Sequence, residues 1–327
     1  MEYWSIGIRS RWRRKADLQT NHRSSITFHF PLSALTMPSS RKTSPPPPSP
    51  LLGAHMSISG GPAKALERGH SVGCTAVQIF VKNNMQWFAK DFATAELEAF
   101  AKSPYRPAIV FGHTSYLINL CATDPVTFER SRAALKAELE RADQLGLPFL
   151  VLHPGAHLGA GIDTGLARIA ESLDFVFASL PKGRCKVALE ATAGQGSTLG
   201  SKFAELAAVI DRCRYPKRLC VCLDTAHLFA AGYDISTPKK FWSVFAEFEK
   251  EVGSARLAAW HLNDSKAALG SRVDRHEHIG KGKIGLAPFR EIMRSEQFSQ
   301  IPKVLETPKG EDLAEDRVNL GVLRGML

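Results

Sequence analysis

The stretch VALEATAGQGSTLGSKFAELAAVIDRCRYPKRLCVCLDT, residues 187–225, decides the fold because it holds one complete unit of a pattern that recurs along the chain. A short apolar run at 187–191 and another at 219–225 enclose an amphipathic segment of helical length. Two short apolar runs joined by one helix are typical of parallel β-strands in a βαβ unit. We therefore expect a parallel sheet, with the helix crossing between its strands.

Eight such apolar runs follow one another from residue 51 onward. They are LLGAHMSI (51–58), AVQIFV (76–81), AIVFGH (108–113), FLVLHPG (149–155), VALEA (187–191), LCVCLDT (219–225), LAAWHLND (257–264) and VLET (304–307). Between them lie amphipathic stretches, and the one from Asp124 to Leu145 begins at Asp124-Pro125 and ends before Gly146, which are helix start and stop signals. Eight such repeats predict an α/β fold, a (β/α)₈ TIM barrel over residues 51–327. A doubly wound sheet is the structural alternative.

The composition is that of a globular protein. Of the 327 residues 44% are hydrophobic, and no apolar run reaches the roughly 18 residues that a membrane-spanning helix needs. Six cysteines are scattered without a C-x-x-C pair, so we expect reduced, buried thiols in an intracellular protein. The net charge of +10 permits contact with a polyanion without establishing it.

The first 50 residues differ from the rest. They include RSRWRRK at 9–15 and PPPPSP at 45–50, and they account for six of the ten net positive charges. Such a composition cannot bury a core, so residues 1–50 are predicted to form a disordered, basic, Pro-rich extension. A targeting segment, a nuclear-type basic signal and a misassigned start with initiation near Met37 all stay open as interpretations.

Six of the eight runs carry an imidazole or a carboxylate at or next to their carboxyl ends: His113, His153, Glu190, Asp224, His261 and Glu306. In a TIM barrel these ends converge on one rim, where active sites form. His227 follows Asp224 by three residues, and Asp274 and His276 form a pair in a later loop. We therefore expect nine polar groups in one place.

Converging carboxylates repel one another and need cations nearby. Mixed His, Asp and Glu ligands without thiolates suit Zn²⁺, with Mn²⁺ and Fe²⁺ as alternatives. Nine groups exceed the three or four that a single ion takes, so the set suggests two or three metals. Sites of this kind favour phosphoester hydrolysis.

Seven blocks, several of them long, carry a family resemblance. They are GAHMSISGG (53–61), HTSYLINL (113–120), HPGAHLG (153–159), LEATAGQGSTLG (189–200), CLDTAHLFAAGYD (222–234), HLNDSKAALGSRVDRHEHIGKGKIG (261–285) and LET (305–307). In this order they resemble the endonuclease IV family of zinc-dependent abasic-site DNA repair endonucleases. The similarity spans residues 51 to about 310, which includes all eight predicted strands.

The resemblance implies an enzyme that hydrolyses the phosphodiester 5′ to an abasic site in double-stranded DNA and leaves a 3′-hydroxyl. It implies three zinc ions per chain and a metal-bound hydroxide as the nucleophile, with Glu190 and Glu306 as catalytic residues. The implied ligands are His113, His153 and Glu190 for one ion, Glu190, Asp224, His261 and Glu306 for a second, and His227, Asp274 and His276 for a third. We expect a monomer, located in the nucleus or the mitochondrion if the source is eukaryotic.

Several residues are candidates for contacts with DNA. Tyr116 and Leu117 resemble the family's wedge into the duplex at the lesion, although burial in the core is the alternative. Lys82, Arg272 and Arg275 lie in predicted rim loops and are candidate phosphate contacts, as are Lys281 and Lys283.

The chain departs from the family pattern at two positions. Ala191 stands where Asn is common after the bridging Glu, so we expect one hydrogen bond that supports the metal ligands to be missing. Met85, in KNNMQW at 82–87, stands where an inserting Arg is often found. A flexible apolar side chain can fill the gap left by a flipped nucleotide, so we predict that Met85 touches DNA; packing under the loop is the alternative.

Two other functions remain as alternatives. A metal-dependent sugar isomerase or epimerase uses the same barrel, but it has no use for the set formed by His227, Asp274 and His276. A non-catalytic DNA-binding barrel is expected to have lost ligands, and no ligand position is lost here.

Overall fold

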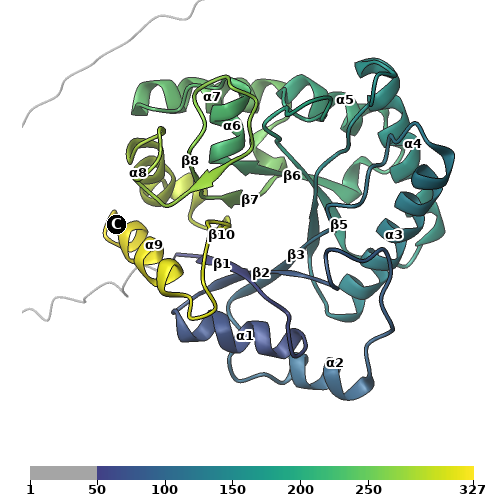
Figure 1. Cartoon of the computed structure of the whole chain (residues 1–327), viewed down its shortest axis with the longest axis horizontal. Helices are drawn as coiled ribbons and strands as arrows, with labels where there is room; N and C mark the ends of the chain where they lie inside the picture. Colours follow the sequence, from purple (N-terminus) through teal and green to yellow (C-terminus); the bar gives the residue numbers. More distant parts are fainter. Residues whose placement is uncertain (1–49) are drawn as a thin grey trace, which may run out of the picture. The chain divides into compact units, whose positions relative to one another are not determined.

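Eight parallel strands close into a barrel in the computed structural model of the chain, which describes residues 50–327 (Figure 1). Around the barrel the strand order is β1-β10-β7-β6-β5-β4-β3-β2. The strands are β1 (Leu52–Met56), β2 (Ala76–Phe80), β3 (Ile109–His113), β4 (Phe149–Leu152), β5 (Lys186–Glu190), β6 (Leu219–Asp224), β7 (Leu257–His261) and β10 (Lys303–Leu305). The predicted TIM barrel is confirmed, and the doubly wound sheet is wrong because β1 pairs with β10 and closes the sheet.

Helices surround the barrel on the outside (Figure 1). They are α1 (Pro62–Ser71), α2 (Thr94–Ala101), α3 (Pro125–Gln144), α4 (Ile162–Ser179), α5 (Phe203–Arg212), α6 (Thr225–Ala231), α7 (Pro238–Glu251), α8 (Ala287–Arg294) and α9 (Ala314–Arg324). The predicted start signal of α3 works as expected, since Asp124 Oδ2 accepts a hydrogen bond from the Thr127 amide at 2.8 Å. Gly146, with φ of 66°, follows its end.

A small antiparallel pair, β8 (Asp264–Ser265) and β9 (His276–Glu277), lies between β7 and α8. The predicted strand at 257–264 is therefore β7 followed by β8. The Asp264 carboxylate holds this segment together, because it accepts hydrogen bonds from the amides of Gly280, Gly282 and Ile284. A Cβ at Gly282 would lie 2.5 Å from Asp264 Oδ1, so only glycine allows this approach.

The apolar core has two layers. Residues such as Phe111, Val151 and Val304 fill the inside of the barrel, and a larger cluster lies between the strands and the helices. All six cysteines are free and buried, as expected. Apolar packing thus covers both faces of the strands whose ends carry the site.

The predicted extension over residues 1–50 falls almost wholly outside the described residues, so it stays a prediction. Among residues 50–327, no helix has both the length and the apolar character needed to cross a membrane.

Candidate metal centre

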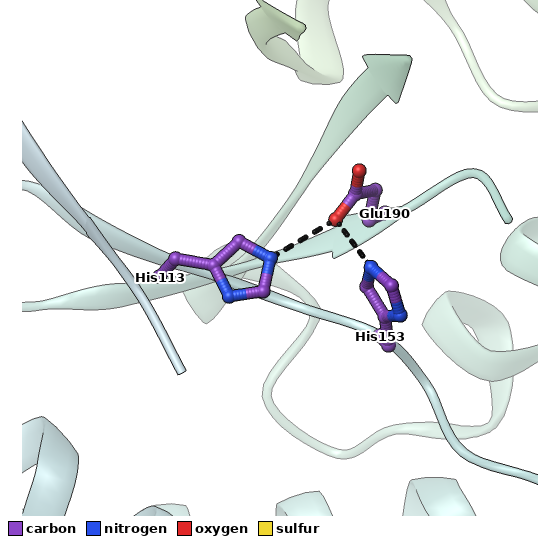
Figure 2. A group of neighbouring side chains, drawn as sticks. All are labelled: His113, His153 and Glu190. Atoms are coloured by element: carbon purple, nitrogen blue, oxygen red, sulfur yellow. Dashed lines mark hydrogen bonds and ion pairs between the residues drawn. The ribbon is translucent and has the colours of Figure 1, made fainter. Parts of the chain in front are cut away.

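Three residues from neighbouring strand ends form a first group of metal-ligating atoms (Figure 2). His113 ends β3, His153 follows β4 and Glu190 ends β5. Glu190 Oε2 lies 3.2 Å from His113 Nε2 and 3.0 Å from His153 Nε2. His113 Nδ1 is 2.7 Å from the Thr114 carbonyl, which requires a proton on Nδ1 and leaves the Nε2 lone pair directed at the group.

The other oxygen of Glu190 belongs to a second group, formed with Asp224, His261 and Glu306. His261 Nδ1 lies 2.9 Å from Glu190 Oε1 and 3.1 Å from Glu306 Oε2. Asp224 Oδ2 is 3.8 Å from the same nitrogen. One carboxylate therefore faces two groups with its two oxygens, as a bridging ligand does.

A third group contains Asp224, His227 and His276. The carboxylate of Asp274 lies beside it, with one oxygen 3.2 Å from His227 Nε2 and the other 3.4 Å from His276 Nε2. Asp224 Oδ2 is 3.5 Å from His276 Nε2, so Asp224 stands between the second and third groups. All nine predicted residues lie close together. The sequence did not indicate that Asp224 belongs to both the second and the third group.

The electrostatics of the centre favour cations. Burial alone would raise the pKa of the Glu190 carboxyl, but His261 and His153 hold this pKa well below its usual value. His261 likewise holds the pKa of Glu306 well below its usual value. Burial would lower the imidazole pKa of His227, yet Asp224 and Asp274 raise it well above the ordinary value. The negative charge of these carboxylates, which raises the pKa of His227, would also stabilise a bound metal ion.

Unpartnered nitrogens test the fit of metal ions to these residues. His227 Nε2 and His276 Nε2 are both buried and make no hydrogen bond within residues 50–327. A buried polar atom without a partner is costly, and here both atoms point at carboxylates at ligand-like distances. Imidazole nitrogens and carboxylate oxygens without thiolates are the donor set that Zn²⁺ takes, so the residues fit this ion.

Two buried amides support the ligands and were missed from the sequence. Gln78 of β2 donates to Glu306 Oε1 at 2.6 Å and accepts from His261 Nε2 at 2.8 Å. Asn263 donates to Asp224 Oδ2 at 2.7 Å and accepts from the Glu306 amide at 2.8 Å. The one available signal was a polar residue inside an apolar run, AVQIFV and LAAWHLND. Such amides fix ligand orientation.

Two exposed apolar side chains stand in the loops after β2 and β3, and that of Tyr116 lies beside the first group. Met85 is 73% exposed and Tyr116 55% exposed, so core packing is wrong for both. The Tyr116 ring centroid lies 5.3 Å from that of His113 and 5.7 Å from that of His153. Leu117 is half-buried in the same turn. Arg272 and Arg275 are exposed in the segment between β8 and β9.

The expected phosphate contact at Lys82 is wrong. Lys82 is 3% exposed, and its ammonium group lies 2.9 Å from Glu138 Oε1. It also donates to the carbonyls of Asn83 and Gln86. Its proton donors are used inside the protein, so this cation holds a loop instead of facing a polyanion.

A cavity of about 660 Å³ opens next to the second group, lined by His55, Phe80, Asn83, Tyr116, Glu306 and Lys309 among others. A larger cavity of about 900 Å³ lies between the C-terminal parts of α3 and α4 and includes residues 146–148, which precede β4. Lys82, Phe88, Ala89 and Asp91 from the segment after β2 also line it, but none of the nine metal-ligating residues does. The 660 Å³ cavity borders the centre at Glu306, and a further cavity of about 260 Å³ borders it at His153 and Asp274.

Comparison with known proteins places the chain in a family. Residues 66–324 match the family model of the xylose isomerase-like TIM barrel. The probable endonuclease 4 of Chloroflexus aurantiacus is 49% identical over 280 residues, which cover 85% of this chain and 98% of that relative. The probable endonuclease 4 of Geobacter sulfurreducens is 46% identical over 278 residues, which cover 84% and 94%.

Solved structures agree. The crystal structure of endonuclease IV from Thermus thermophilus matches with a TM-score of 0.74 and 35% identity, covering 85% of this chain and 98% of that chain. A D-tagatose 3-epimerase-like protein shares the fold alone, at 15% identity and a TM-score of 0.64, covering 84% and 96%. The identity to the endonucleases over nearly their whole length, together with the three-group centre, shows that the chain belongs to the endonuclease IV family of DNA repair endonucleases.

Proposed function

We propose that this endonuclease acts on double-stranded DNA at abasic sites, hydrolysing the phosphodiester 5′ to the lesion and leaving a 3′-hydroxyl. One observation carries the proposal: Glu190 faces two ligand groups with its two oxygens, while His227, Asp274 and His276 form a further group next to them. An isomerase on this fold has no use for that further group. Phosphodiester hydrolysis does, because charge develops on both the attacking and the leaving oxygen.

We assign three zinc ions to the centre. The proposed ligands are His113, His153 and Glu190 for the first, Glu190, Asp224, His261 and Glu306 for the second, and His227, Asp274 and His276 for the third. Ions held there would supply the positive charge that makes water a nucleophile at neutral pH and stabilises the leaving oxygen.

The chain's own residues orient this chemistry. Glu190 and Glu306 are the proposed catalytic residues, because the pKa of each carboxyl is held well below its usual value and both converge on His261 at 2.9 and 3.1 Å. Gln78 holds Glu306 in place, and Asn263 holds Asp224 in place. These ligands are therefore ordered before substrate binds, so binding loses no conformational entropy in ordering them.

The rim residues bind the substrate. Met85 and Tyr116 provide exposed apolar surface in the loops after β2 and β3, with Tyr116 beside the first ligand group, and such surface suits contact with a duplex opened at a missing base. Leu117 adds apolar surface in the same turn, and Arg272 and Arg275 provide cations for backbone phosphates. We propose that the enzyme works as a monomer inside the cell, in the nucleus or the mitochondrion of a eukaryote.

A cleavage assay tests the function. The substrate is an end-labelled duplex with one tetrahydrofuran abasic analogue, which cannot undergo β-elimination, so any cut there is hydrolysis. We expect one incision 5′ to the analogue and a product that a polymerase extends, both lost with a strong chelator and restored by Zn²⁺. Incision 3′ to the analogue, or no incision by metal-loaded protein that instead epimerises a ketohexose, would overturn the proposal.

A further inference from the structure

The buried ion pair between Lys82 and Glu138 has no part in the metal centre. The two charged atoms are 2.9 Å apart, and the side chains are 2% and 1% exposed. Removing two charges from water is costly, and the pair persists only where further hydrogen bonds satisfy both groups. The partners of those hydrogen bonds therefore indicate which parts of the structure the ion pair holds together.

Each partner reaches a different rim loop. Lys82 donates to the carbonyls of Asn83 and Gln86, which folds residues 82–87 around its ammonium group. Glu138, from α3, accepts a hydrogen bond from the Ser115 amide at 3.1 Å. One carboxylate thus joins the loop that follows β2 to the loop that follows β3.

Ser115 ties the same loops together directly. Its hydroxyl donates to the Asn84 carbonyl at 2.6 Å and accepts from the Leu117 amide at 3.2 Å. The neighbouring residues along the chain are Met85, which is 73% exposed, and Tyr116, which is 55% exposed. The contacts that join the two loops are therefore made by the buried residues Ser115 and Glu138, whereas the neighbouring Met85 and Tyr116 side chains are exposed.

A second residue of α3 fixes the rest of the first loop. Arg141 Nε donates to the Val81 carbonyl at 2.8 Å, and its Nη1 donates to the Lys90 carbonyl at 2.6 Å. Arg141 lies three residues after Glu138, so both side chains lie on one face of the helix. This face of α3 therefore acts as the base on which both loops rest.

We propose that Glu138 is a positioning residue for lesion recognition, which holds Met85 and Tyr116 at a fixed spacing so that both engage the abasic duplex together. The proposal rests on the proposed function. Loops ordered before binding lose less conformational entropy when DNA arrives, which strengthens affinity for the lesion. The hydrolytic step, at ligands that Glu138 does not contact, is not affected once the DNA is bound.

The test uses Glu138→Gln and Ser115→Ala on the full chain with the abasic-analogue duplex. Both should raise KM by about tenfold, as for residues coupled within one network, and leave kcat within about twofold of the wild-type value. The ratio of affinities for abasic over undamaged duplex should fall in parallel. Ser115→Ala keeps the ion pair, so it remains informative even if Glu138→Gln leaves Lys82 unpaired and unfolds the protein.

A double-mutant cycle separates positioning from general stability. In a protein that already carries Met85→Ala and Tyr116→Ala, Ser115→Ala should have almost no further effect on KM, because nothing is left to position. An undiminished effect in that background would overturn the proposal.

Arg132→Met is the matched control. Arg132 is a buried cation of the same helix that contacts Ser172 and Glu171 instead of the rim loops. It should lower the melting temperature without changing KM. If Arg132→Met raises KM as much as Ser115→Ala does, the loops have no special role and the proposal is wrong.

The two proposals fail in different ways. If the wild-type protein does not incise the abasic duplex, the proposed function fails, and the positioning role fails with it. If the wild-type protein incises normally while Ser115→Ala keeps its KM, its kcat and its preference for damaged DNA, only the positioning role is wrong.

Discussion

Glu190 is the residue on which the metal centre most depends. It is fully buried, and its two oxygens face His113 and His153 on one side and His261 on the other. An amide of the same shape keeps the packing but removes the charge that two ligand groups share. A substitution at Glu190 can therefore remove the chemistry of the centre without disrupting the fold.

Glu190→Gln should leave the protein folded and slow incision of the abasic duplex by at least about 100-fold, the order of effect for losing one preorganised charge contact. Incision rates and a thermal melt of the same sample measure this. Glu98→Gln, at an exposed carboxylate on α2, is the control and should cleave normally. Near-normal cleavage by Glu190→Gln would remove the bridging role.

Met85→Ala should weaken binding to the abasic duplex by roughly tenfold through lost apolar contact, and the 73% exposed side chain predicts an unchanged melting temperature. The slope of affinity against salt should hardly move, since the loss of a phosphate contact changes it by roughly 1. Val318→Ala, at an exposed valine on α9, is the control. A drop of several degrees in Tm with unchanged affinity would refute the contact.

The sequence predicted the gathering of His113, Glu190 and the four other strand-end ligands because each lies at or next to the carboxyl end of an apolar run, and the barrel brings these ends together. It failed at Lys82, because the partner Glu138 lies on a helix whose position relative to the loop is set only by the tertiary structure. Gln78 and Asn263 escaped notice since a buried amide has no spacing that marks it. The local sequence pattern predicts which strand, helix or loop a residue lies on, but tertiary packing determines which groups its side chain contacts.

Helix α6 shows how one element sets two ligands. It begins directly after β6, where Asp224 accepts hydrogen bonds from the amides of Ala226 and His227 at 2.7 and 3.0 Å. His227 lies in the first turn, and its Nδ1 is 3.0 Å from the Ala191 carbonyl. The helix cap thereby fixes a carboxylate and an imidazole relative to one another.

His227→Ala should reduce the bound zinc from three ions to two and slow incision by roughly 100-fold, because one charge that stabilises the leaving oxygen is lost. Metal analysis of the folded variant gives the count. His70→Ala, at an exposed histidine on α1, should bind three ions and cleave normally. Loss of all three ions together would show that the third site is not independent.

At the scale of elements, the eight strands were predictable, but the residues at which they begin and end were not all predictable. The run 149–155 was expected as one strand, but β4 ends at Leu152. Pro154 has no N–H to donate, and Gly155 has a φ of 131°, so neither continues the sheet. The pair β8 and β9 was missed because strands of two residues are too short to show alternation.

The whole barrel depends on contact between the two ends of the described chain. Leu52 of β1 pairs with Lys303 of β10, and Gly53 pairs with Val304. A Cβ at Gly53 would lie 1.7 Å from the Ala76 carbonyl oxygen of β2, so glycine is required where these strands close the sheet. The elements that close the barrel all lie within residues 50–327.

Removing residues 1–49 should leave the melting temperature within about 2 °C of the full chain and the incision rate unchanged, because every strand of the barrel remains. Removing residues 1–56 is the matched control: it deletes β1 and should abolish folding. A large loss of stability or cleavage in the shorter deletion would show that the first 49 residues support the barrel.

Counting the metal ions bound to the wild-type chain tests the central claim most directly. Native mass spectrometry of the protein loaded with Zn²⁺ and then desalted gives the number for each folded molecule. The three ligand groups around Glu190, Asp224 and His227 predict three zinc ions, and removing them should abolish incision. A single bound ion, as expected of a sugar isomerase, or full incision by the metal-free chain would contradict the account.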